Sequence, residues 1–227
     1  KWIATFRNGL YAFNENYNFF SNGTFYSSIL VEQSNIKYFK MQKPMSSYLV
    51  MLAIGNFEKQ LEVSKSGTPL EFYIDKKDVT KFEPTFRYSR QMFDYLEQEI
   101  GVKYPWGMYR QVPVRDFLYA GMENTSATLF TTRYVVDSVG FEDRSYTNVN
   151  AHELAHQWFG NLVTAESGKH HWLQEGFATY YALLAEKEIY GEDYFYAKLH
   201  ESAQELKFAS RTDGISVLNA TDSSLSF

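Results

Sequence analysis

The stretch His152-Glu153-Leu154-Ala155-His156 decides the fold of this chain, together with Trp172-Leu173-Gln174-Glu175-Gly176 further along. On a helix of 3.6 residues per turn, two histidines four positions apart stand about 40° from each other, so both imidazoles can bind one ion. Glu153 is about 100° from His152 and reaches the edge of the same site. Two His and one Glu are a known ligand set for zinc, in sites that keep a fourth position for water. The pattern therefore predicts one Zn²⁺ held by His152, His156 and Glu175.

The spacing between the two stretches supports this prediction. Glu175 lies nineteen positions after His156, which leaves room for a turn and for the start of a second helix. The third ligand then approaches the ion from that second helix. The alternative is a pair of surface histidines beside an ordinary acidic residue, and the presence of Glu175 at this spacing argues against it.

Composition narrows the class of protein. The chain has 227 residues, of which 18% are aromatic, so it can bury a sizeable core and favours an ordered globular fold. Its 22 basic and 27 acidic residues give a net charge of −5 without a basic run, which argues against a nucleic-acid partner. It contains no cysteine, so a metal must be bound by nitrogen and oxygen.

The sequence offers no candidate for a membrane span. The longest apolar run, Tyr48 to Ile54, suits a buried strand and is too short to cross a bilayer. The chain begins with Lys1-Trp2-Ile3, without an initiator Met or a signal segment, so we expect it to be an excised fragment. Cytoplasmic and cell-envelope locations are both open, as is the oligomeric state.

Strand patterns precede helix patterns, which predicts an α+β fold. Residues 1–58 read as short strands separated by turn signals, and the polar stretch from Glu58 to Thr68 is a candidate linker before a strand at Leu70 to Ile74. Further strands are expected at 109–116 and 127–132. Helices are expected at 84–100, where Gly101 can end the helix, and at 149–159, 173–190 and 192–209.

A third motif, Gly121-Met122-Glu123-Asn124, lies about thirty residues before the histidines. Together, in this order, the three motifs resemble the gluzincin aminopeptidases of the aminopeptidase N and leukotriene-hydrolase type. The resemblance extends to Pro44 through Leu49, which looks like the last strand of the family's N-terminal β domain. It implies the end of a β domain in residues 1–58 and a thermolysin-like zinc peptidase domain, a mixed sheet plus helices, in residues 59–227.

The resemblance also implies roles for individual residues. Glu153 is the general base that takes a proton from water and passes it to the leaving amine. Glu123 binds the free α-ammonium of a peptide substrate, and the backbone around Gly121, Met122 and Asn124 binds the peptide as an added strand. Many family members have Gly-Ala where this chain has Ala120-Gly121, and both residues are small enough to keep the backbone accessible.

Three further positions have two interpretations each. If the family pattern holds, Tyr119 lines the pocket for the first side chain of the substrate; otherwise it is a core aromatic residue. Thr179, one turn after Glu175, either hydrogen-bonds a ligand histidine or only packs in its helix. His170-His171 is better explained by a place in a loop or at the start of a helix than by metal binding.

Family members also use a tyrosine downstream of the glutamate ligand to donate to the oxyanion. The last tyrosine of this chain is Tyr196, and Ser223 to Phe227 resembles the stretch that leads into the family's tyrosine. Loss of one oxyanion donor typically costs about 2.7 to 4 kcal/mol of transition-state stabilisation. We therefore expect the fragment to bind zinc but to hydrolyse peptides weakly or not at all.

Two other functions remain open. A thermolysin-like zinc endopeptidase shares the metal helix and the glutamate ligand but has no use for Glu123. A metal-stabilised binding module that has lost catalysis would need the ligands, but it would not need Glu153. A free-amine substrate and its N-acetylated twin separate the first alternative from an aminopeptidase.

Overall fold

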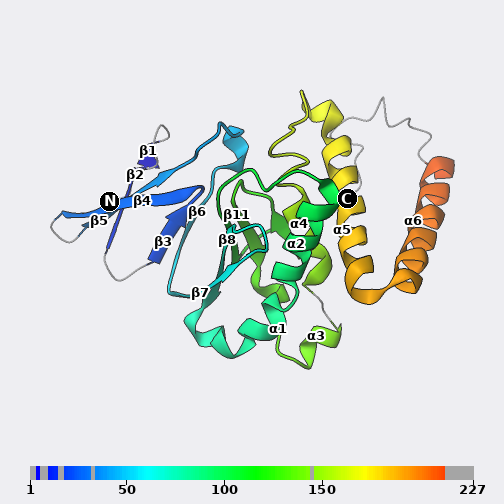
Figure 1. Cartoon of the computed structure of the whole chain (residues 1–227), viewed down its shortest axis with the longest axis horizontal. Coiled ribbons are helices and arrows are strands. Elements are labelled where there is room, and N and C mark those ends of the chain that lie inside the picture. The colour runs from blue at the N-terminus through cyan, green and yellow to red at the C-terminus, as the bar shows by residue number, and fades with distance from the viewer. Residues whose placement is uncertain (1–3, 6–9, 15–17, 32–33, 144–145, 213–227) are drawn as a thin grey trace.

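The structure is a computed structural model and describes residues 4–5, 10–14, 18–31, 34–143 and 146–212. Strands make up the N-terminal part, a second sheet lies in the middle, and helices dominate the C-terminal part (Figure 1). This order confirms the predicted α+β fold. None of the described helices is both long and apolar enough to cross a membrane.

Short antiparallel strands form the N-terminal part. A four-stranded sheet has the order β1-β2-β5-β4, and β3 pairs with β6. The bounds are β1 Ala4–Thr5, β2 Leu10–Asn14, β3 Asn18–Ser21, β4 Thr24–Val31, β5 Ser34–Lys40 and β6 Leu52–Gly55. A cluster of buried residues that includes Phe19, Phe20 and Phe39 packs these strands against Val112 and Ala127 of the next sheet.

The central sheet has five strands in the order β10-β11-β9-β8-β7, with bounds β7 Phe57–Val63, β8 Pro69–Asp75, β9 Tyr109–Val114, β10 Gly121–Met122 and β11 Ala127–Thr131. Strands β8, β9 and β11 are parallel, and the edge strands β7 and β10 run antiparallel to their neighbours. Leu70, Phe72 and Ile74 alternate along β8 and are buried in the main core. Edge strand β10 carries the Gly-Met pair of the third motif.

The helices lie on one side of this sheet, and the last of them packs against the helix before it rather than on the sheet (Figure 1). Their bounds are α1 Phe82–Phe86, α2 Ser89–Ile100, α3 Gly140–Asp143, α4 Thr147–Ala155, α5 His171–Tyr190 and α6 Glu192–Thr212, with 3₁₀ turns η1 Ser47–Leu49, η2 Lys76–Lys81, η3 Thr132–Tyr134 and η4 Gly168–His170. Gly101 ends α2 with φ of 72°, in the left-handed conformation expected of a glycine cap.

Three expected elements differ from the structure. Most of the polar stretch predicted as a linker is strand β7, at the edge of the central sheet. Even its apolar residues Leu61 and Val63 are exposed, so little covers this strand, and an exposed strand can be made of polar residues. The apolar run Tyr48 to Ile54 is not one strand, because its first residues form the turn η1. The helix predicted at 84–100 is two helices, because the backbone of Tyr88, with φ of −104° and ψ of 1°, departs from helical angles between them.

One further helix ends earlier than predicted, and other predictions are not tested by the structure. The helix expected at 149–159 ends at Ala155, and the chain continues in turns as far as Val163. The domain boundary between residues 58 and 59 stays a prediction. Asn8-Gly9, one of the turn signals in residues 1–58, lies outside the described residues, as does the stretch from Ser223 to Phe227.

Candidate metal centre and peptide-binding segment

Helices α4 and α5 pack closely and bring the predicted ligands together. Ala151, Leu154 and Ala155 of α4, and Ala178 and Ala182 of α5, are fully buried in the same core cluster. Alanine adds little side-chain volume between two helices, so their backbones can approach closely. The ligand-bearing turns of the two helices therefore lie within side-chain reach of each other.

The ligand atoms form a compact triangle. His152 Nε2 lies 3.0 Å from His156 Nε2 and 3.2 Å from Glu175 Oε2, and His156 Nε2 lies 3.4 Å from the same carboxylate oxygen. Two ligands about 2.05 Å from a tetrahedral zinc ion stand about 3.3 Å apart. The three residues therefore fit a zinc ion, and among the described residues they are the group whose donor atoms could hold a metal.

Outer contacts orient both histidines. His156 Nδ1 donates to the carbonyl oxygen of Phe159 at 2.9 Å, which leaves Nε2 facing the other ligands. Thr179 Oγ1 lies 3.4 Å from His152 Nδ1, so the polar contact considered for Thr179 is present. His171 begins α5, as expected for a helix-start residue, and its Nε2 also lies 3.1 Å from Glu175 Oε1. This last contact was not predicted from the sequence.

Charges concentrate at this centre. Burial, partly offset by His156, raises the pKa of Glu153 to about 8, and Glu123 and Glu175 add to the shift. Burial opposes the charged form of His156, but the nearby carboxylates outweigh it and raise its pKa to about 9. Burial likewise opposes ionisation of Glu175, but hydrogen bonds from both ligand histidines hold its pKa well below the usual range. Three carboxyl groups, those of Glu123, Glu153 and Glu175, therefore lie near each other at the centre, an arrangement suited to a cation.

Glu153 lies directly against the segment Gly121 to Asn124. A Cβ atom on Gly121 would overlap the Glu153 side chain, so this glycine makes room for the carboxylate. Glu123 and Asn124 are buried, whereas Gly121 and Met122 are partly exposed. The structure therefore brings the segment and the buried acid together beside the three ligand residues.

Residues that follow His156 form hydrogen bonds to this segment. Gln157 Nε2 and Asn161 Nδ2 both donate to the carbonyl oxygen of Glu123, at 3.1 and 2.7 Å. Gln157 Oε1 also accepts from the backbone N–H of Ser126 at 2.8 Å. The Asn124 side chain donates to the carbonyl oxygen of Leu49 at 3.2 Å, so the segment is also hydrogen-bonded to the turn η1.

Tyr48 is a residue of this centre that the sequence analysis placed in a buried strand. Its hydroxyl donates to Glu123 Oε1 at 3.4 Å and accepts from Gln174 Nε2 at the same distance. Its ring is half exposed because the turn η1 presents it at the surface. No local pattern signals this role, since 75 residues separate Tyr48 from Glu123.

Tyr119 is exposed, so it is not a core aromatic residue. It lines a cavity of about 430 Å³ with Leu118, Ala120, Thr131, Arg133 and Tyr134. This lining follows directly on the segment that begins at Gly121, but it includes none of the three ligand residues. Its role as the pocket for the first substrate side chain stays a prediction.

Comparisons with known proteins agree with this arrangement. The family model described as "Peptidase family M1 domain" matches residues 85–223, more than half of the chain. Glutamyl aminopeptidase of Sus scrofa is 33% identical over 158 residues, which is 66% of this chain and 17% of that protein. Leukotriene A-4 hydrolase of Xenopus laevis is 34% identical over 190 residues, covering 82% of this chain and 30% of that protein.

The chain thus spans a sixth to a third of the length of these relatives. The matched region contains the Gly-Met-Glu-Asn segment, the two histidines and Glu175, in the order in which the structure brings them together. From these motifs and the family match, the chain belongs to peptidase family M1, a family of metallopeptidases.

Proposed function

We propose that the protein is a zinc-dependent aminopeptidase that hydrolyses the N-terminal bond of peptides with a free N-terminus. His152, His156 and Glu175 hold one Zn²⁺, which when bound supplies a water of lowered pKa and polarises the scissile carbonyl. The triangle of donor atoms, 3.0 to 3.4 Å on each side, supports this ligand set.

Glu153 acts as the general base in this proposal. Its carboxylate takes a proton from the attacking water and delivers it to the departing amine. Its place against Gly121 supports the role, because a peptide lying along that segment has its first peptide bond beside the carboxylate. Gly121 and Met122 offer backbone groups to the peptide, and Asn124 shapes the segment from inside.

The observation that carries the exopeptidase assignment is the buried Glu123. Its carboxylate accepts a hydrogen bond from Tyr48, and no described lysine, arginine or histidine lies within ion-pair distance of it. A buried carboxylate without a cation favours a cationic ligand. The α-ammonium of a peptide supplies that cation, and a blocked N-terminus does not.

Glu123→Gln tests this assignment in the full-length protein. We expect kcat/KM for an aminoacyl β-naphthylamide to fall about 10- to 150-fold, as for loss of a charged hydrogen bond, while cleavage of the N-acetyl twin stays negligible. Glu192→Gln, on the exposed start of α6, is the matched control and should leave both rates unchanged. A parent enzyme that cleaves both substrates equally would instead be an endopeptidase of the thermolysin type.

The 227-residue chain on its own is expected to turn over these substrates weakly or not at all. Residues 197–227 contain no tyrosine that could serve as the family's oxyanion donor. Turnover by the isolated chain is compared with turnover by a longer protein that includes it. Equal rates would mean that the chain needs no further donor.

A further inference from the structure

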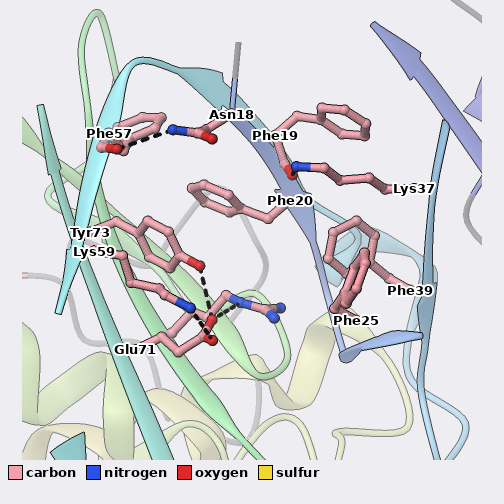
Figure 2. A pocket seen from close by; sticks show the side chains of 11 residues that line it. Asn18, Phe19, Phe20, Phe25, Lys37, Phe39, Phe57, Lys59, Glu71 and Tyr73 are labelled. Carbon is pink, nitrogen blue, oxygen red and sulfur yellow. Dashed lines mark hydrogen bonds and ion pairs between the residues drawn. The ribbon is translucent and has the colours of Figure 1, made fainter. Parts of the chain in front are cut away.

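A second cavity lies between the N-terminal strands and the central sheet (Figure 2). Its volume is about 370 Å³, and strands β3, β4 and β5 line one side while β7, β8 and β9 line the other. None of its lining residues belongs to the metal centre or to the peptide-binding segment. The cavity is therefore separate from the metal centre and from the peptide-binding segment.

Aromatic rings form most of the walls. Phe20 stacks on Tyr73 with the ring centres 4.2 Å apart, and Phe57 lies 5.5 Å from Phe20 at a steep angle. On the opposite side, Phe25 and Phe39 make an edge contact at 6.0 Å. Figure 2 shows the ring of Phe20 pointing toward Tyr73 and Phe57, with Phe25 and Phe39 on the other side of the cavity. A flat apolar body of one ring suits such walls.

One ammonium group in the lining has no carboxylate partner among the described residues. Lys37 reaches from β5 toward Phe19, and its Nζ lies 3.4 Å from that carbonyl oxygen and 4.4 Å from the ring centre (Figure 2). No described carboxylate lies within ion-pair distance of it. Burial lowers the pKa of Lys37, because the ammonium has lost water without gaining an anion. An anionic ligand would supply the missing partner.

The single carboxylate of the lining is already occupied. Glu71 accepts from Lys59 at 3.2 Å, from the Tyr73 hydroxyl at 3.0 Å and from Arg110 Nε at 2.7 Å. Arg110 also donates to the carbonyl oxygens of Ser21 and Gly23. Three cations against one carboxylate leave the lining positive, so its electrostatics favour an anion over a neutral or cationic ligand.

We propose that this cavity binds a small organic carboxylate that carries one apolar ring. The ring lies among Phe20, Phe25 and Phe57, and the carboxylate pairs with the ammonium of Lys37. The site is separate from the proposed zinc centre and does not depend on the peptidase activity.

The test is ligand-observed NMR on the zinc-loaded protein with three probes of one shape, 4-phenylbutyrate, 4-phenylbutanol and 4-phenylbutylamine. We expect a Kd on the order of 1 mM for the acid, as ordinary ligand efficiency gives for a molecule of this size. The alcohol and the amine should bind at least about tenfold more weakly, since they cannot form a charged hydrogen bond with Lys37.

Lys37→Met removes the charge and keeps the apolar stem. The substitution should lower the affinity for 4-phenylbutyrate at least about tenfold. It should leave the affinity for 4-phenylbutanol unchanged, and an unchanged affinity also shows that the cavity is intact. Lys40→Met is the matched control, because Lys40 ends the same strand outside the lining, and it should change nothing.

Three results would overturn the proposal. The alcohol could bind as tightly as the acid, or Lys37→Met could leave the affinity of the acid unchanged. The third is loss of acid binding on addition of EDTA, which would place the carboxylate on the metal. Retention of acid binding with EDTA, together with its loss in Lys37→Met, supports the proposal.

Discussion

Arg110→Met should destabilise the protein strongly, because this arginine joins the N-terminal strands to the central sheet. The guanidinium is 4% exposed and donates to Glu71 at 2.7 Å and to the carbonyl oxygens of Ser21 and Gly23 at 2.8 and 2.6 Å. Methionine keeps the apolar stem but leaves one buried carboxylate without its main partner and two carbonyl groups without this donor.

The magnitude follows from these contacts. Removal of one partner of a buried ion pair costs about 3–5 kcal/mol, and Glu71 keeps Lys59 and Tyr73, which places the loss near the lower end, at about 3–4 kcal/mol. For a chain of this length that corresponds to a fall of about 10 °C in Tm. Lys59→Met removes an exposed donor from the same carboxylate and should cost no more than about 1 kcal/mol.

The effect of Arg110→Met should also depend on pH. Burial opposes ionisation of Glu71, but Arg110 outweighs it, so the pKa of Glu71 in the folded protein lies below its ordinary value of 4.5. A carboxyl group whose pKa is depressed by folding adds stability that is fully present above its unfolded-state pKa. This stability is lost as the pH falls through the folded-state pKa. The difference between wild type and Arg110→Met should therefore be largest near neutral pH and shrink below about pH 4.5.

Urea denaturation followed by tryptophan fluorescence measures both variants, since the chain has four tryptophans. The reasoning is refuted if Arg110→Met and Lys59→Met lose equal stability. A difference between wild type and Arg110→Met that grows toward acid would refute it as well, because it would mean that the Glu71 charge does not contribute.

Further predictions concern the metal centre. Glu153→Gln should keep about one zinc per chain by metal analysis while hydrolysis falls at least about 100-fold, as for loss of a general base; zinc loss would instead make Glu153 a ligand. Thr179→Val should weaken zinc binding about tenfold in a chelator competition, because it removes the contact with His152 Nδ1, whereas Thr68→Val, in the turn between β7 and β8, should not. Gln157→Leu should raise KM for free-amine substrates and lower the free energy of unfolding by about 2–3 kcal/mol, because the Glu123 carbonyl and the Ser126 N–H each lose a hydrogen bond. Unchanged kinetics would show that substrate binding does not need these two hydrogen bonds.

The helices around the ligands were predictable because their signals are local. Two histidines four positions apart and a glutamate on the next helix are fixed by helical geometry, and Gly101 marks the end of α2 through its backbone alone. The end of the metal helix was less predictable. His156 is still helical in its backbone angles, but the chain then turns so that the Phe159 carbonyl can accept from its ring.

Other features depend on contacts between distant parts of the chain. Strand β7 is polar and reads as a linker, and it is a strand only because β8 pairs along its whole length. Tyr48 contacts Glu123 across 75 residues, and Arg110 reaches carbonyl groups almost 90 residues earlier. No window of sequence contains both partners, so neither contact has a local signal. The His171 contact with Glu175 has helical spacing, and it could have been found by testing all i, i+4 pairs on α5.

The positions of Gln157 and Asn161 connect ligand geometry to substrate binding. Both follow His156 within one short stretch, and both donate to the carbonyl oxygen of Glu123. The turn after α4 thus sets the distance from the three proposed zinc ligands to the carboxylate proposed to bind the substrate amine. Substitutions here should change selectivity for the N-terminus while the ligand triangle, which rests on the packing of α4 against α5, stays intact. We therefore expect zinc content and substrate selectivity to change independently when residues of this turn are substituted.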